Sequence, residues 1–208
     1  MCGRYTLTCP DEEALVRSLP FDEFSETRIQ FRPRYNIAPG QISPVVYLES
    51  GKPVLVDALW GFARATGGLT INARSETADR TAMFRDAFRD GRCLVPADGF
   101  FEWRREGRVN QPYLFRKEDG ALFVMAGMCQ EGRYVVLTRD SKGEVTEIHD
   151  RMPVLLEPDD ARRWLADGEI GKGPKVTKAA VSPRVNRIEN DDAACIDPVP
   201  QGSFDFDT

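Results

Sequence analysis

Short apolar runs separated by glycine-containing turns constrain the fold of this chain more than any other feature. Residues 41–62 contain two such runs around Ser50-Gly51, and residues 113–138 contain three more around Asp119-Gly120 and Glu131-Gly132. Runs of this length that are rich in β-branched residues and joined by such dipeptides predict antiparallel hairpins. We therefore expect a mainly antiparallel, curved sheet.

Three segments have helical features instead. Residues 10–19 carry acids in the first turn and end at Pro20, residues 77–88 place apolar side chains on one helical face, and residues 158–165 begin with proline and two aspartates. Helices are few and do not alternate with strands as in βαβ units, so we expect a single α+β domain in which a few helices flank the sheet.

Length and composition agree with one globular unit. The chain has 208 residues, of which 41% are hydrophobic and 29% charged, and it lacks both a signal peptide and an apolar run of about 18 residues. We expect a soluble, cytoplasmic protein with a domain over residues 1–190 and a loosely packed acidic tail over residues 191–208. The five cysteines are scattered without a CxxC pair and there is one histidine, so we expect no disulfide framework, metal or cofactor.

Charge is unevenly distributed along the chain. The net charge of −5 argues against a protein that coats nucleic acid non-specifically. Between Thr27 and Arg116, however, 14 Lys and Arg stand against 9 Asp and Glu, and almost all the basic residues are arginines. Arginine forms planar, bidentate contacts with phosphate, so a short stretch of nucleic-acid backbone is a plausible ligand, although solvated surface arginine is the simpler interpretation of each residue.

Cys2 directly follows the initiator methionine, and its small side chain permits removal of Met1 by methionine aminopeptidase. The mature chain would then begin with a 1,2-aminothiol whose α-amine has a reference pKa of about 7.7 to 8.0, against about 10.4 for lysine. Such an amine condenses with an aldehyde to an imine, which the thiol closes into a five-membered thiazolidine ring. Cys2 is therefore a candidate nucleophile, although a cysteine at position 2 also occurs by chance.

Two polar clusters contain residues that a packed core does not need. Asn72 and Arg74 lie just before the predicted helix at 77–88, and helix capping by a nearby hydroxyl would explain neither of them. Glu102 lies among aromatic residues in the segment 96–103, where apolar surroundings would raise its pKa and suit it to general acid catalysis. The other interpretation of Glu102 is an outward-facing residue on an alternating strand.

A third cluster holds the single histidine, His149. A lone histidine is more often structural or exposed than catalytic, but histidine is the side chain best suited to proton transfer near neutral pH. Arg151 follows two residues later and would point to the same side of a strand. A proton shuttle and a phosphate-binding group are therefore expected to face one cleft.

These clusters form motifs that resemble the SRAP family, the SOS response-associated peptidase-like proteins that crosslink to abasic sites in single-stranded DNA. The main motifs are Met1-Cys-Gly-Arg-Tyr5, Asn72-Ala-Arg-Ser-Glu76, Gly99-Phe-Phe-Glu-Trp103 and His149-Asp-Arg-Met-Pro153. Further similar segments are Tyr35-Asn36-Ile-Ala-Pro39-Gly-Gln41, Leu59-Trp60-Gly61, Cys93-Leu-Val-Pro96 and Val181-Ser-Pro-Arg-Val-Asn186. The resemblance implies a single α+β domain with a barrel-like strand core flanked by helices.

The resemblance also implies roles for individual residues. Cys2 would trap the ring-opened sugar of an abasic site as a thiazolidine, Glu102 would assist ring opening and imine formation, and His149 would handle protons on the sugar oxygen and in the reverse reaction. Asn72 would hold the N-terminus or the adjacent backbone. Arg4, Arg74 and Arg151 would contact phosphates. Trp60 and Trp103 would offer ring faces on which bases stack, or would line the cleft.

The expected partner is single-stranded DNA with an abasic site, which the covalent adduct would shield during the DNA damage response. We expect a monomer that binds no metal and does not associate with a membrane. When bound to DNA, it would associate with the nucleoid. Two other classes of function stay open from the sequence. A cysteine peptidase or amidohydrolase would use the Cys2 thiolate with His149 as base. A non-covalent module that reads modified DNA would not need a free N-terminus.

Overall fold

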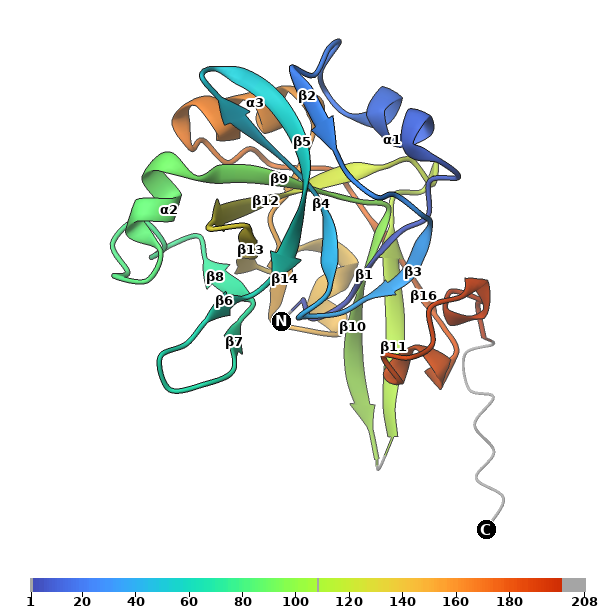
Figure 1. Cartoon of the computed structure of the whole chain (residues 1–208). Coiled ribbons are helices and arrows are strands. Elements are labelled where there is room, and N and C mark those ends of the chain that lie inside the picture. Colours follow the sequence, from blue (N-terminus) through green and yellow to red (C-terminus); the bar gives the residue numbers. More distant parts are fainter. Residues whose placement is uncertain (1, 108, 200–208) are drawn as a thin grey trace.

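A computed structural model describes residues 2–107 and 109–199, and most of its strands belong to two sheets (Figure 1). One sheet is mixed and nine-stranded, and the other is antiparallel and five-stranded. Together with few and short helices, these sheets confirm the α+β class predicted from the strand pattern.

The mixed sheet closes on itself. Adjacent strands of this sheet pair antiparallel in the order β5, β4, β9, β12 and β13. The last strand, β13, then pairs in parallel with β5 at Tyr134 and Trp60. The amide of Gly61 donates to the Tyr134 carbonyl at 2.7 Å and continues this closure. The expectation of a barrel-like core is therefore confirmed. The closing strands are β4 (Ile42–Glu49), β5 (Lys52–Trp60), β9 (Arg92–Ala97), β12 (Phe123–Gln130) and β13 (Arg133–Asp140).

Four short strands extend this barrel sheet. Two of them, β8 and β14, pair with β13, while β15 pairs with β12 and β2 with β5. A separate two-stranded sheet, β6 with β7, lies beside the barrel (Figure 1). These strands are β2 (Glu26–Arg28), β6 (Phe62–Ala63), β7 (Leu69–Thr70), β8 (Asn72–Arg74), β14 (Arg151–Pro153) and β15 (Leu155–Leu156).

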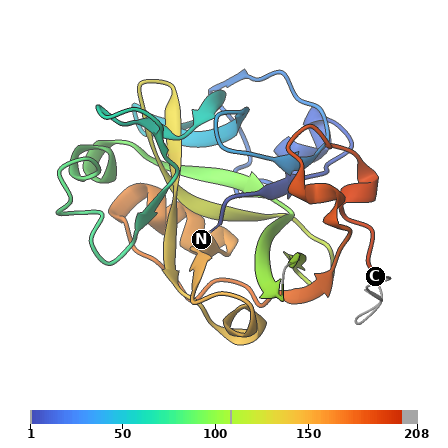
Figure 2. The ribbon, with the colours of Figure 1, turned by 90° about the horizontal axis from the view of Figure 1, so that it is seen from below.

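The antiparallel sheet has the order β16-β11-β10-β1-β3. Its central hairpin, β10 with β11, extends away from the barrel (Figure 1). Viewed from below, the barrel strands and this hairpin lie on either side of the dark-blue start of the chain (Figure 2). The strands are β1 (Tyr5–Leu7), β3 (Arg34–Ile37), β10 (Gly99–Glu106), β11 (Val109–Arg116) and β16 (Thr177–Ala180).

Two of the three predicted helices form where the sequence places them. The first, α1 (Glu12–Ser18), is capped by Asp11, whose carboxylate accepts the Ala14 amide at 2.8 Å. The third, α3 (Pro158–Asp167), begins with its proline and ends at Gly168, which adopts a φ of 78°. Among the described residues, no helix combines the length and apolar character of a membrane span.

The prediction of one helix over residues 77–88 is wrong for residues 77–84. In this region the α-helix is α2 (Arg85–Asp90), and the residues before it form successive turns. Thr81 contributes to this break because its hydroxyl donates to the Thr77 carbonyl at 2.7 Å, and the Phe84 amide then bonds to the Thr81 carbonyl at 2.8 Å. Three short 3₁₀ helices complete the described elements: η1 (Gly143–Glu147), η2 (Pro183–Asn186) and η3 (Ala193–Cys195).

The prediction of a loosely packed tail is wrong for residues 191–199. The carboxylate of Asp191 accepts the amides of Tyr35 and Asn36 at 2.7 and 3.0 Å and pairs with Arg34. Cys195 is fully buried in a small apolar cluster. The ion pair and the two amide hydrogen bonds stabilise the negative charge of Asp191, so the acidic character of the segment does not prevent its packing. Residues 200–208 lie outside the described residues, and the domain boundary at 190 stays a prediction.

Candidate active site

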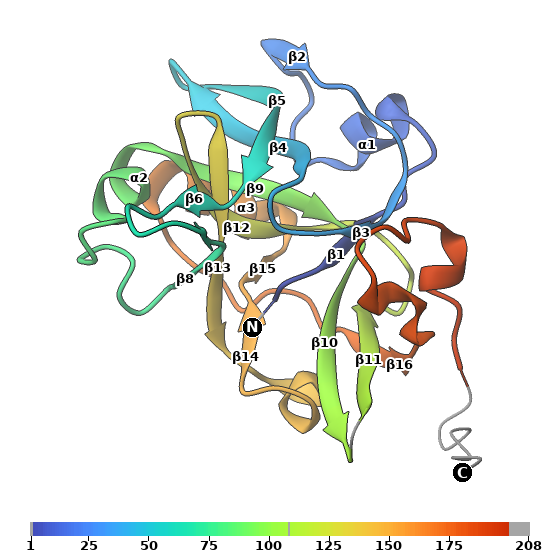
Figure 3. The same cartoon turned by 60° about the horizontal axis from the view of Figure 1, so that its bottom comes forward.

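The first residues of the chain lie between the two sheets because β1 is held by its neighbours. Tyr5 pairs with Phe100 of β10, and the Phe101 amide donates to the Arg4 carbonyl at 3.0 Å. This antiparallel register carries the chain before Tyr5 along β10 toward Glu102. Figure 3 shows the dark-blue segment leading into β1 starting between β14 and β10.

Asn72 holds the backbone of Cys2 from the barrel side. Its Nδ2 donates to the Cys2 carbonyl at 2.8 Å, and its own strand is fixed by parallel pairing with Val136 of β13. Its Oδ1 is buried and has no hydrogen-bond partner within the part of the chain that the structure describes. The contact is the one expected for Asn72, and its role in a reaction stays a prediction.

Glu102 is a buried carboxyl on the opposite side, with a residue exposure of 2%. Burial raises its pKa to about 7, because the low-polarity surroundings disfavour the charged form, and the nearby charge of Asp150 acts in the same direction. The interpretation of Glu102 as an outward-facing residue is therefore wrong. A carboxyl that is about half protonated at neutral pH can both donate and accept a proton.

The Cys2 thiol is also buried and lies 3.8 Å from the Arg4 carbonyl, to which it donates. Burial and the neighbouring Glu102 carboxylate raise its pKa well above the usual value. The thiol is therefore protonated at neutral pH. Catalytic cysteines that attack as thiolates have a lowered pKa instead.

His149 lies in the turn that follows η1, before β14 begins. The expectation that it shares a strand face with Arg151 is therefore wrong. The Arg151 amide donates to His149 Nδ1 at 3.0 Å, and burial lowers the pKa of the ring below 6.5. Nδ1 also lies 2.8 Å from the exposed Asp150 carboxylate, but an ion pair there would need a proton on Nδ1. Since Nδ1 already accepts a hydrogen bond, we assign a neutral ring with its proton on Nε2.

Arg151 connects three parts of the barrel. Its guanidinium binds both carboxylate oxygens of Glu76 at 2.7 and 2.9 Å, Asp140 at 2.6 Å and the Thr138 carbonyl at 2.7 Å. The hydrogen bonds from Arg151 lower the pKa of Glu76 to about 2. The positive charge is thus matched by carboxylates, and the predicted phosphate contact of Arg151 stays a prediction.

The other two arginines differ in exposure. Arg74 is exposed at the end of β8 and is available to a polyanion. Arg4 is partly buried, and its guanidinium donates to Asn36 Oδ1 and to the Val185 carbonyl, both at 2.8 Å. Burial also lowers the pKa of Arg4. This geometry favours a structural role for Arg4 over the predicted phosphate contact.

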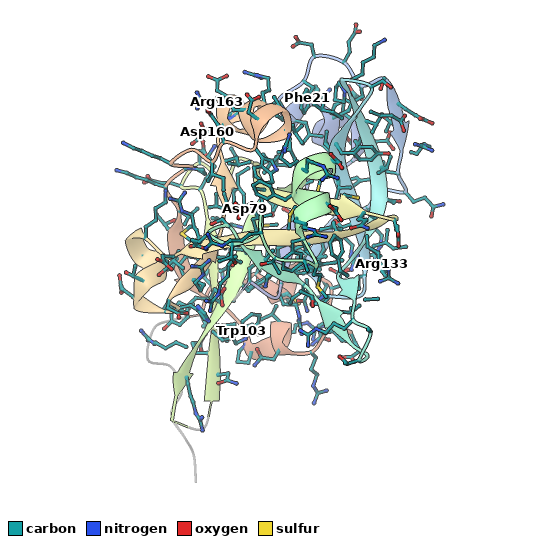
Figure 4. All side chains as sticks on the ribbon, turned by 90° about the vertical axis from the view of Figure 1, so that its left-hand side faces the viewer. Phe21, Asp79, Trp103, Arg133, Asp160 and Arg163 are labelled. Carbon is teal, nitrogen blue, oxygen red and sulfur yellow. The ribbon has the colours of Figure 1, made fainter. Side chains whose placement is uncertain are left out.

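The two tryptophans have different environments. Trp60 is fully buried between Tyr5 and Tyr134, and its Nε1 donates to the Ile71 carbonyl at 3.0 Å. The prediction that Trp60 offers a face to bases is therefore wrong, because it ends β5 where the barrel closes. Trp103 lies on the extended hairpin (Figure 4) and is partly buried, and its Nε1 donates to Asn186 at 2.7 Å. Its stacking role stays a prediction.

Two residues that support the site were not singled out from the sequence. Glu76 pairs with Arg151, and the Asp98 carboxylate accepts the Thr6 hydroxyl at 2.5 Å and the Thr8 hydroxyl at 2.6 Å, which fixes β1. Glu76 ends the motif that begins at Asn72, and Asp98 lies between the motifs 93–96 and 99–103, so position in or next to a motif was the available signal. Among the described residues, no three His, Cys, Asp or Glu side chains are grouped to hold a metal.

Comparison with protein families gives a match over residues 1–190 to the model described as SOS response associated peptidase (SRAP). The chain belongs to the SRAP family. Among curated SRAP relatives, Abasic site processing protein YedK of Escherichia coli is 32% identical, over 96% of this chain and all of that protein. Abasic site processing protein HMCES of Gallus gallus is 29% identical, over 83% of this chain and 68% of that protein.

Solved structures show the same fold. A Bordetella bronchiseptica protein is 22% identical with a TM-score of 0.72, over 87% of this chain and 100% of the other. A Bacteroides thetaiotaomicron protein is 20% identical with a TM-score of 0.73, over 96% of this chain and 100% of the other. At this identity the likeness concerns the SRAP fold alone.

Proposed function

We propose that this SRAP protein processes abasic sites by forming a covalent crosslink to single-stranded DNA through Cys2, after removal of Met1. The observation that carries the proposal is the placement of Cys2, whose backbone is held by Asn72 and whose thiol is close enough to the buried Glu102 for that carboxylate to raise its pKa. The names of the relatives, abasic site processing proteins, support the substrate class.

In the proposed reaction the neutral α-amine of Cys2 adds to the aldehyde carbon of the ring-opened sugar. Loss of water from this adduct forms a C=N bond. The thiol sulfur then adds to the imine carbon while its proton passes to the nitrogen, which closes the thiazolidine ring with no change in oxidation state. A thiol that stays protonated suits this order, because the amine attacks first and the sulfur follows.

Glu102 and His149 supply the proton transfers. With a pKa of about 7, Glu102 is available as an acid that protonates the sugar ring oxygen and the hydroxyl group that departs as water, and as a base that recovers the proton. His149 is neutral with a donor Nε2–H, which suits it to hold the sugar oxygen. The neutral thiol and its raised pKa argue against a cysteine peptidase, which needs an activated thiolate.

Replacing Cys2 with serine separates the two bond-forming steps and tests the proposal. The variant keeps its α-amine and loses the sulfur that closes the ring, so we expect a reversible imine that only borohydride traps. Wild-type protein is expected to give a heat-stable adduct without reductant. The measurement is a denaturing gel of each protein with single-stranded DNA that contains one abasic site.

Intact mass must first confirm that both proteins have lost Met1. DNA of the same sequence without the abasic site is the control, and no adduct is expected with it. A Cys2→Ser adduct as stable as that of wild type would refute ring closure by the thiol. The lack of any wild-type adduct would refute the crosslinking function.

Charge reversal at Arg74 is expected to weaken DNA binding at all sequences. Arg74 is exposed and lies two residues beyond Asn72 on β8, so both side chains extend to the same side of the strand. Loss of one phosphate contact should reduce the slope of log affinity against log salt by about 0.7 for single-stranded DNA. The measurement is the DNA affinity of Arg74→Glu over a salt titration.

The control is Arg17→Glu on α1, which carries the same charge change away from β8 and should leave that slope intact. Equal slopes for both variants would place Arg74 outside the interface.

A further inference from the structure

The two groups proposed to transfer protons are attached to different sheets. Glu102 is on β10 of the antiparallel sheet, whereas His149 follows η1 in the connection between β13 and β14 of the barrel. Within the described ranges, no strand pairing joins these two sheets. Asp98 joins β9 to β10 through the backbone at one end of the site, so side-chain contacts can add a second link between the sheets near His149.

His149 is rigidly attached to η1. The Ser141 amide donates to the Asp150 carbonyl at 2.9 Å and closes the base of the loop. Within the loop, the His149 amide donates to the Val145 carbonyl at 2.9 Å, and the Val145 side chain is fully buried. Any displacement of η1 must therefore move His149.

Two contacts tie η1 to the edge strand β16, and we call them the η1 strap. The Glu144 carboxylate accepts the backbone amide of Lys178 at 3.0 Å, and the Lys178 ammonium forms an ion pair with Glu147. The Lys178 side chain is 13% exposed, so solvent screens its ion pair less than that of a fully exposed lysine. A carboxylate that accepts a backbone amide forms a charge-assisted hydrogen bond, which is stronger than a neutral one.

From Lys178 the backbone pairing leads to Glu102. Lys178 pairs with Phe115 of β11, and Tyr113 on the same strand pairs with Glu102 of β10. The η1 strap thus links the loop that carries His149 to the sheet that carries Glu102. In Figure 3 the unlabelled tan coil of η1 lies between β14 and the hairpin of β10 and β11.

We propose that Glu144 and Lys178 are positioning residues that hold His149 in register with Glu102 across the site. The proposal rests on the proposed function for its catalytic consequence. A displacement of about 1 Å of a catalytic group can cost about 100-fold in rate, so partial loosening should have a measurable effect. Neither residue is expected to touch DNA.

The test removes both contacts without a change in net charge. Glu144→Ala/Lys178→Ala should lower the first-order rate of adduct formation at saturating DNA by about tenfold, with the half-saturating DNA concentration unchanged. Glu144→Gln/Lys178→Arg retains an acceptor oxygen and a cation and should keep most of the rate. Glu118→Ala/Lys175→Ala, which removes one exposed pair of opposite charges nearby, is the matched control and should react as wild type.

Two further readouts separate positioning from general loosening. In a His149→Ala background the strap substitutions should cause no further slowing, because the group they position is absent. In DNA-free protein, His149 is the single histidine, so its ring NMR signals are unambiguous. Loss of the strap should move its pKa from its lowered value toward 6.5 as the ring gains solvent.

If the wild-type protein forms no adduct, that result counts against the proposed function alone. The NMR titration of His149 still tests the η1 strap in that case. An unchanged His149 titration in Glu144→Ala/Lys178→Ala would overturn the strap. A rate equal to that of the matched control, or the same slowing with and without His149, would overturn it as well.

Discussion

Any residue retained before Cys2 is expected to abolish formation of the proposed covalent adduct while leaving the fold intact. Acylation converts the α-amine into an amide nitrogen, which is not nucleophilic, so the first bond of the proposed reaction cannot form. The expected loss is complete, because the proposed reaction starts at the α-amine of Cys2. The measurement is a denaturing gel of protein and abasic single-stranded DNA, with one extra residue before Cys2 confirmed by intact mass.

A cleavable N-terminal extension provides the matched control. Before cleavage the protein should bind DNA weakly and form no adduct, and cleavage that exposes Cys2 should restore adduct formation in the same preparation. Thermal unfolding should be similar for both forms, because Asn72 binds the carbonyl of Cys2 and not its amine, and β1 begins at Tyr5. An extended protein that crosslinks at the normal rate would contradict a reaction that starts at the α-amine.

Glu102→Gln is expected to slow adduct formation by about 10² to 10⁴, the usual contribution of a positioned general acid or base. Glutamine keeps the size of the side chain and removes its ionisable proton. Glu118→Gln, an exposed position on the loop after β11, is the control and should react as wild type. A Glu102→Gln rate within error of this control would remove Glu102 from the reaction.

The pH profile of the same reaction gives an independent check. The acid form of Glu102 is lost as pH rises through its pKa of about 7, whereas the neutral fraction of the α-amine grows as pH rises toward about 8. Wild-type protein should therefore show a rate maximum between these values, with apparent constants that belong to the coupled pair. Glu102→Gln should lose the decline at high pH and follow the amine alone. A decline that persists in the variant would assign it to another group.

Several features of the candidate site could be predicted because they are local. Asn72, Glu102 and His149 belong to polar clusters that interrupt the apolar segments, and the motif order around them led to the family. The environment of Glu102 was also predictable, since aromatic residues surround it in the sequence, and its raised pKa confirms that expectation.

Other features of the site depend on residues far apart in the chain. From the sequence, Trp60 is an aromatic residue that could contact bases, but the pairing of β13 with β5 buries it. Arg4 is a candidate phosphate ligand, but its guanidinium binds the Val185 carbonyl instead. The strand assignment of His149 was wrong because a 3₁₀ helix anchored by Val145 displaces the start of β14. Periodicity along the chain carries no information about such contacts.

The sequence by itself determined the elements whose signals are short-range. Alternating apolar runs and glycine turns produced the hairpins, and Asp11 and Gly168 set the start of α1 and the end of α3, because turns and caps depend on a few adjacent residues. Only the tertiary structure decided barrel closure, the shortened α2, the packing of residues 191–199 and the placement of His149 in the loop between η1 and β14. Each of these depends on hydrogen bonds or burial between distant segments, whose free energy appears only when the chain has folded.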